Sequence, residues 1–164
     1  MGRDEEEWTR VAKMVEEAGA DAIELNFSCP HMMEKGTGSA IGQDPVAVEL
    51  FTKAARKGTK LPILVKLTPN VATMSEAAEA AIRGGANGIS AINTIQSIIL
   101  EGDAYVAQGG YSGNAVKPIA LRFITEIKKN EKVNKYHLSG MGGIQSWEDA
   151  LDFLELVANS LQGT

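Results

Sequence analysis

A short junction motif that recurs three times constrains the fold of this chain more than any other feature. The stretches AGADAIEL (18–25), GGANGISA (84–91) and LVANSLQG (156–163) each end a helical pattern, turn at Ala-Asp or Ala-Asn, and begin an apolar strand. Successive copies lie about two βα units apart, which is the internal repeat of a barrel or of a wound sheet. The motif therefore predicts an α/β fold.

Apolar periodicity places helices and strands in strict alternation along the chain. The pattern predicts helices over 4–17, 44–57, 76–83, 115–129 and 147–156, and strands over 20–27, 62–67, 88–92, 136–139 and 159–162. Residues 93–112, which are rich in glycine, are predicted to form a long loop. Trp8 and Trp147 are interpreted as packing residues on their helices. Alternation of this kind requires right-handed crossovers and a parallel sheet.

Composition excludes several classes of protein. The 164 residues fit one domain over 1–164, and the net charge of -5 is interspersed, unlike the basic stripe of a nucleic-acid binder. No apolar run reaches the about 18 residues of a membrane span, and MGRDEEEW lacks the apolar core of a signal peptide, so a cytoplasmic location without membrane contact is expected. The single cysteine excludes an internal disulfide and a cysteine-ligated iron–sulfur cluster, and the histidines lack metal-ligand spacing.

Polar residues follow four of the predicted strands at their carboxyl ends, where parallel α/β proteins place their chemistry. We expect these residues to converge on one rim of the sheet. They are Asn26, Ser28 and Cys29 after the first strand, Lys66, Thr68 and Asn70 at the end of the second, and Asn93 and Thr94 after the third, together with the polar backbone groups of the glycine-rich stretch 140–143 after the fourth.

Each of these residues also has a purely structural interpretation. Cys29 could be a small buried hydrophobic residue, or an exposed thiol that acts as an acid or a nucleophile. Lys66 could extend from an edge strand to solvent, or place a fixed positive charge against an anion. Asn26 and Asn93 could cap turns, or bind the amide edges of a planar heterocycle.

Glycine-rich segments are candidates for a phosphate site. Gly142 and Gly143 precede a predicted helix, where backbone N–H groups can approach a phosphate closely. The stretch GGYSGNA (109–115) offers a similar turn. Tight βα turns also use glycine, so neither segment is specific alone, although phosphate sites are common near the last two strands of a barrel.

Five motifs, in order along nearly the whole chain, carry a family resemblance. They are ELNFSCP, LVKLTPN, AINT, GYSGNAVKPIALRFI and SGMGGIQSWEDA. Together they resemble the flavin-binding barrel of dihydropyrimidine dehydrogenase, above all the separate barrel subunit of the bacterial NAD-dependent type. The resemblance implies a (β/α)8 barrel that carries FMN, of which this chain would form a partial barrel, roughly strands four to eight.

The resemblance also implies roles for individual residues. Reduced FMN passes a hydride to C6 of uracil or thymine, and Cys29 protonates C5. Asn26, Asn93 and Thr94 would bind the pyrimidine, and Lys66 would lie by the N1/O2 edge of the flavin and favour its anionic reduced form. The flavin phosphate would be bound by backbone N–H groups of Gly113, Gly142, Gly143, Gly163 and Thr164.

The expected partners follow from the same resemblance. Electrons would come from a partner subunit or a further domain that carries FAD and iron–sulfur clusters. An incomplete barrel would also expose its first and last strands, so self-association through the open edge is expected. Two other functions stay open: dihydroorotate oxidation, since dihydroorotate dehydrogenase shares the asparagine–cysteine strand end, the strand lysine and the glycine pair, and an inactive fragment that serves only folding or assembly.

Overall fold

The computed structural model describes residues 4–27, 39–102, 104–156 and 158–163. Its main feature is a parallel sheet of five strands in the order β1-β2-β3-β6-β7. The strands are β1 (Ile23–Asn26), β2 (Ile63–Lys66), β3 (Gly88–Ala91), β6 (His137–Met141) and β7 (Ser160–Gln162). The prediction of a parallel sheet built from five alternating strands is confirmed, although β1 is shorter than predicted and β6 extends two residues further.

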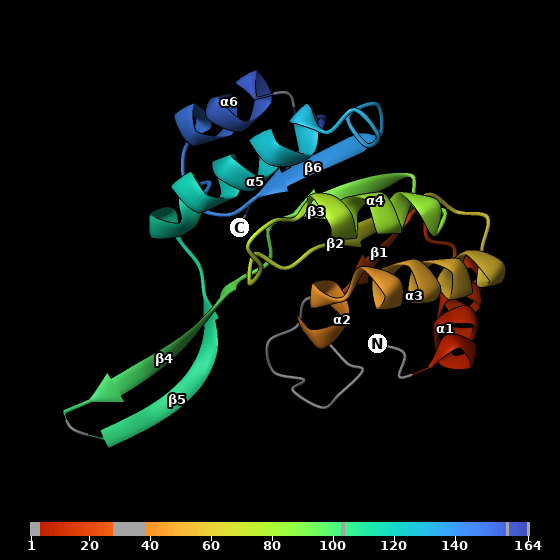
Figure 1. The fold of residues 1–164 in the computed structure, drawn as a ribbon, viewed down its shortest axis with the longest axis horizontal. Coiled ribbons are helices and arrows are strands. Elements are labelled where there is room, and N and C mark those ends of the chain that lie inside the picture. The colour runs from red at the N-terminus through yellow and green to blue at the C-terminus, as the bar shows by residue number, and fades with distance from the viewer. Residues whose placement is uncertain (1–3, 28–38, 103, 157, 164) are drawn as a thin grey trace.

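Helices alternate with these strands along the chain and cover one face of the sheet (Figure 1). They are α1 (Glu5–Glu17), α3 (Pro45–Gly58), α4 (Ser75–Arg83), α5 (Lys117–Lys129) and α6 (Trp147–Glu155), with a short α2 (Ser39–Gln43) and a 3-10 turn η1 (Asn114–Val116). Side-chain caps fix several starts: Asp4 accepts from Glu7 N, and Asp44 accepts from Val46 N with Pro45 in the first turn.

The core lies between the helices and the sheet. Every second strand residue points to the helices and is buried, as Leu25, Val65 and Ile89 show. Trp8 is 4% exposed and meets Phe27 edge to face, with ring centroids 5.1 Å apart, so its predicted packing role is confirmed. The same prediction for Trp147 is wrong. Its side chain is 73% exposed, because α6 buries Phe153, and Trp147 lies six residues away, about a third of a turn from that face.

One hydrogen-bond pattern explains two of the three copies of the junction motif. Asn87 donates its backbone N–H to Ile63 O at 2.8 Å and accepts Ile63 N on its side chain at 2.9 Å. Asn159 does the same with Leu138, at 2.7 and 2.9 Å. Each junction asparagine therefore binds both backbone groups of one residue in the neighbouring strand, which a side chain without an oxygen could not do.

The predicted loop over 93–112 is wrong in part, because most of it forms an antiparallel hairpin. Strands β4 (Ile95–Glu101) and β5 (Ala104–Tyr111) pair along their length, and the hairpin extends away from the rest of the protein (Figure 1). Gly102 lies at the tip with φ +59°. Pairing between the two strands satisfies the backbone groups without help from the main sheet, so the glycines do not prevent strand formation.

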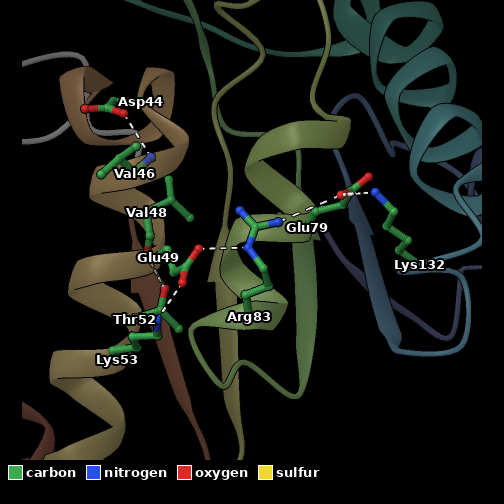
Figure 2. A network of polar contacts seen from close by, with 9 residues as sticks. All are labelled: Asp44, Val46, Val48, Glu49, Thr52, Lys53, Glu79, Arg83 and Lys132. Carbon is green, nitrogen blue, oxygen red and sulfur yellow. Dashed lines mark hydrogen bonds and ion pairs between the residues drawn. The ribbon is translucent and has the colours of Figure 1, made fainter.

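Ion pairs link the helices on the outer surface (Figure 2). Glu49 of α3 binds Lys53 and, at 2.8 Å, Arg83 of α4. Arg83 also lies 3.8 Å from Glu79, which binds Lys132 at 2.8 Å after α5. Hydrogen bonds from Lys53 and Lys132 lower the pKa of Glu49 and Glu79 respectively. The network joins α3, α4 and the segment after α5 on the helical side of the sheet. We call the other side, which the described helices leave uncovered, the open face.

Candidate functional site

A pocket of about 380 Å³ lies at the carboxyl ends of the parallel strands. The expected convergence on one rim is therefore observed for the described residues. Seven predicted site residues line the pocket: Lys66, Asn93, Thr94, Gly113, Gly142, Gly143 and Gly163. Asn26 lies beside it, because Asn93 Nδ2 donates to Asn26 Oδ1 at 3.1 Å. Ser28, Cys29 and Thr164, which were also expected there, lie outside the described residues.

The amide side of the pocket is built at the ends of β1 and β3. Asn93 follows β3, and its Oδ1 also accepts the backbone N–H of Thr94 at 2.7 Å. Asn70, which follows β2, donates to Thr94 O at 3.2 Å and accepts from Gln96 N at 2.8 Å. Sequence reasoning placed Asn70 among the polar residues at the strand ends but gave it no specific role. The structure shows that it anchors the segment that carries Thr94.

Lys66 ends β2 on the sheet face that the helices do not cover. Its side chain is 22% exposed, and Nζ lies 3.6 Å from Glu24 Oε1 on the neighbouring strand. The lysine lines the pocket, so the interpretation that it extends into solvent from an edge strand does not hold. A positive charge in this position can oppose an anion bound in the pocket.

The glycine side of the pocket is built from a turn after β6 and the start of α5. Gly113, Gly142 and Gly143 have φ values of +93°, +119° and +80°, a region that favours glycine. A Cβ on Gly143 would lie 2.9 Å from Gly113 O and from Lys117 N. A Cβ on Gly142 would lie 3.1 Å from Ala120 Cβ. The two glycines therefore let the turn lie directly against the first turn of α5.

An ion-pair cluster fixes the turn to α6. Asp149 accepts from Gln145 N at 2.9 Å and from Ser146 N at 3.0 Å, in a capping box with the Ser146 side chain. Lys117 binds Asp149 at 2.5 Å and Asp152 at 2.6 Å. The hydrogen bond from Lys117, followed by that from Gln145, lowers the pKa of Asp149 from 3.8 to about 2, and Asp149 in turn raises the pKa of Lys117.

The residues present fit a flavin mononucleotide. The glycine turn leaves space that side chains would fill, and its backbone N–H groups suit a phosphate. Ser90 provides a further observation: its hydroxyl is fully buried, lies between Lys66 and Ser139 in the sheet register, and has no hydrogen-bond partner among the described residues.

The described residues contain no candidate metal site and no candidate membrane span. No group of acidic, histidine or cysteine side chains there is arranged to hold a metal ion. None of the helices there has the length and apolar character that a membrane span requires.

Comparisons with known proteins agree with the partial barrel. The chain is 48% identical to the NAD-dependent dihydropyrimidine dehydrogenase subunit PreA of Escherichia coli K12, over all of the chain and 42% of that protein. It is 45% identical to the catalytic subunit of dihydroorotate dehydrogenase B (NAD(+)) of Pyrococcus horikoshii, over 99% of the chain and 53% of that protein. The chain thus spans about half the length of these relatives.

The structural comparison shows the same fold. The crystal structure of Eimeria tenella DHODH in complex with ferulenol superposes with a TM-score of 0.79 at 17% identity, covering 99% of this chain and 50% of that one. The five parallel strands with their helices therefore match part of a larger barrel, as predicted. The family model described as dihydroorotate dehydrogenase matches residues 1–164, and the chain belongs to this family.

Proposed function

We propose that residues 1–164 form one FMN-binding domain of an oxidoreductase that reduces the C5–C6 double bond of uracil or thymine. The observation that carries the proposal is the pocket itself, which brings an amide pair, a lysine and a glycine turn to one edge of the sheet. Amides suit the imide edge of a pyrimidine, a lysine suits an electron-rich ring, and the glycine turn suits a phosphate.

Bound FMN would supply the hydride that adds to C6 of the pyrimidine. Asn26, Asn93 and Thr94 would hold the pyrimidine by its polar edge, and the hydrogen bond between the two asparagines orients both amides. Cys29, three residues after Asn26 along the chain, would donate the proton to C5. The hydride and the proton together saturate the double bond.

Lys66 and the glycines would serve the cofactor. The ammonium of Lys66 would lie at the N1/O2 edge of the ring, where negative charge develops on reduction. Backbone N–H groups of Gly113, Gly142 and Gly143, with Gly163 and Thr164, would bind the phosphate. Electrons would come from a partner subunit that carries FAD and iron–sulfur clusters, in keeping with the name of the Escherichia coli relative, which is itself a subunit.

Dihydroorotate oxidation is the second candidate. The match to the dihydroorotate dehydrogenase family model, and 45% identity to the catalytic subunit from Pyrococcus horikoshii, favour it. The two reactions use the same cofactor and opposite directions of hydride transfer. The substrate with which the bound flavin reacts therefore distinguishes them. A third possibility, an inactive fragment, differs from both because it requires no flavin.

Flavin binding is the first test. The purified chain is mixed with FMN and desalted, and the absorption spectrum of retained flavin is recorded. Retained flavin, followed by its oxidation with uracil or thymine after chemical reduction, supports the proposal. Reduction of the bound flavin by dihydroorotate in place of that reaction supports the second candidate. Failure to retain any flavin contradicts both, and leaves the inactive fragment.

The role of Cys29 has its own test, in a version extended to the length of the relatives. Cys29→Ala should retain flavin and lose about 10²–10⁴ in turnover, the usual contribution of a general acid. Cys29→Ser, a weaker acid in the same position, should retain a little more activity than the alanine variant. Unchanged turnover in Cys29→Ala would refute proton donation by this residue.

A further inference from the structure

We infer that Glu24 is a positioning residue for Lys66, which it holds at the pocket and whose positive charge it partly offsets. The inference rests on the proposed flavin function, because it concerns how strongly Lys66 favours the reduced flavin. Nothing in the sequence motifs assigned Glu24 a role: it reads as one of the polar residues that alternate with apolar ones in this strand.

The sheet register places the two side chains together. Asn26 pairs with Lys66, and Glu24 precedes Asn26 by two residues, so all three point to the same face. Glu24 Oε1 lies 3.6 Å from Lys66 Nζ, and the side chains are 29% and 22% exposed. This distance is longer than a charge-assisted hydrogen bond of about 2.8 Å. The carboxylate therefore attracts the ammonium without forming a short hydrogen bond, and Lys66 remains part of the pocket lining.

The other carboxylate oxygen is held from across the sheet. Gln162 Nε2 donates to Glu24 Oε2 at 2.7 Å and to Ser139 Oγ at 3.2 Å. Gln162 belongs to β7 and Glu24 to β1, the two outer strands of the five-stranded order. Glu24 is thus held on one oxygen by Gln162 while the other faces Lys66.

The pairing of Glu24 with Lys66 should change the redox equilibrium of the bound flavin in a definite direction. In a partly buried site an ion pair at this distance acts as a dipole, and its field at the flavin is weaker than that of a lone ammonium. Replacing Glu24 by the neutral, equally sized glutamine should strengthen the effect of Lys66 and favour the anionic reduced flavin. Replacing Lys66 by methionine leaves the carboxylate and should do the reverse. In the double variant, Glu24→Gln with Lys66→Met, the two shifts should largely cancel.

The first experiment measures the midpoint potential of FMN bound to each variant by reductive titration. Glu24→Gln should shift the equilibrium between oxidised and reduced flavin at least threefold toward reduced, which for two electrons is about 14 mV at about 30 mV per tenfold. Glu49→Gln is the matched control, since Glu49 also pairs with a lysine but lies on the outer helical surface. An unchanged or lowered potential in Glu24→Gln overturns the inference.

The second experiment needs no flavin. Competitive acetylation of the flavin-free chain, read by mass spectrometry, should show Lys66 reacting at least twofold faster in Glu24→Gln, with Lys53 as the internal reference. An unchanged rate at Lys66 overturns the inference whether or not the chain binds FMN. A faster rate in a chain that retains no flavin would contradict the proposed function and, with it, the redox purpose inferred for Glu24. A faster rate together with a raised potential supports the inference.

Discussion

Substitution of Gly143 by alanine tests the proposed phosphate site directly. Two contributions determine how much stability the substitution removes. A side chain at φ +80° is strained by about 1–2 kcal/mol. The added Cβ would also lie 2.9 Å from Gly113 O and Lys117 N, which are backbone atoms that cannot rotate away, and overpacking of this kind costs about 1–3 kcal/mol. We therefore expect Gly143→Ala to lower the free energy of unfolding by about 2–5 kcal/mol.

The same substitution should act selectively on the cofactor. Relief of the two contacts requires the turn after β6 to move away from the start of α5, and both segments would contact the phosphate. We expect the FMN affinity to fall at least tenfold, about 1.4 kcal/mol, with a smaller change for riboflavin, which lacks the phosphate. Urea unfolding gives the stability, and quenching of flavin fluorescence gives both affinities.

Gly19→Ala is the matched control for backbone strain. Gly19 has φ +84°, nothing lies within 4 Å of its added Cβ, and it precedes the amino end of β1, whereas the pocket lies at the carboxyl ends of the strands. Its substitution should cost about 1–2 kcal/mol of stability and leave the ratio of FMN to riboflavin affinity unchanged. The reasoning is refuted if Gly143→Ala is destabilised as expected but keeps the wild-type affinity ratio.

Two further predictions concern α6, the helix that follows the glycine turn. Phe153→Ala should lose about 3–5 kcal/mol in urea unfolding, since Phe153 is fully buried against Gly140, whereas Leu151→Ala, which is 43% exposed on the same helix, should lose less than about 1 kcal/mol. The lowered pKa of Asp149 means that its contribution is complete above about pH 4 and is lost as pH falls toward 2. The stability difference between wild type and Asp149→Asn should therefore shrink over that range, and a constant difference would contradict the pairing with Lys117.

Residue patterns predicted the main sheet because the signals that specify each of its strands and helices lie close together in the sequence. Each βα unit carries its own helix spacing, its cap and its apolar strand, and strict alternation leaves few topologies. The rim residues were predictable for the same reason: parallel strands deliver their carboxyl ends to one edge. That is why Lys66, Asn93 and the glycine turn could be placed in one pocket before any contact was known.

Contacts between distant residues were not predictable in this way. The hairpin β4–β5 depends on pairing between its strands, which the glycine content of the segment obscured. Trp147 was assigned to packing from its residue type, whereas the buried face of α6 is set by Phe153. Glu24 and Gln162 lie far apart in the sequence and meet only across the open face of the sheet. Position along the chain carries no sign of such a contact.

The junction asparagines have a consequence for the opposite end of the sheet. Asn87 and Asn159 each bind both backbone groups of a neighbouring strand residue, at the amino ends of the strands. These bonds fix the level at which each strand starts, and since the strands are short, they also fix the level at which each one stops. The alignment of Lys66, Ser90 and Ser139 across neighbouring strands thus depends on the two junction asparagines, which do not line the pocket. Substitution of a junction asparagine should therefore displace the pocket residues at the opposite end of the strands, although those residues themselves are unchanged.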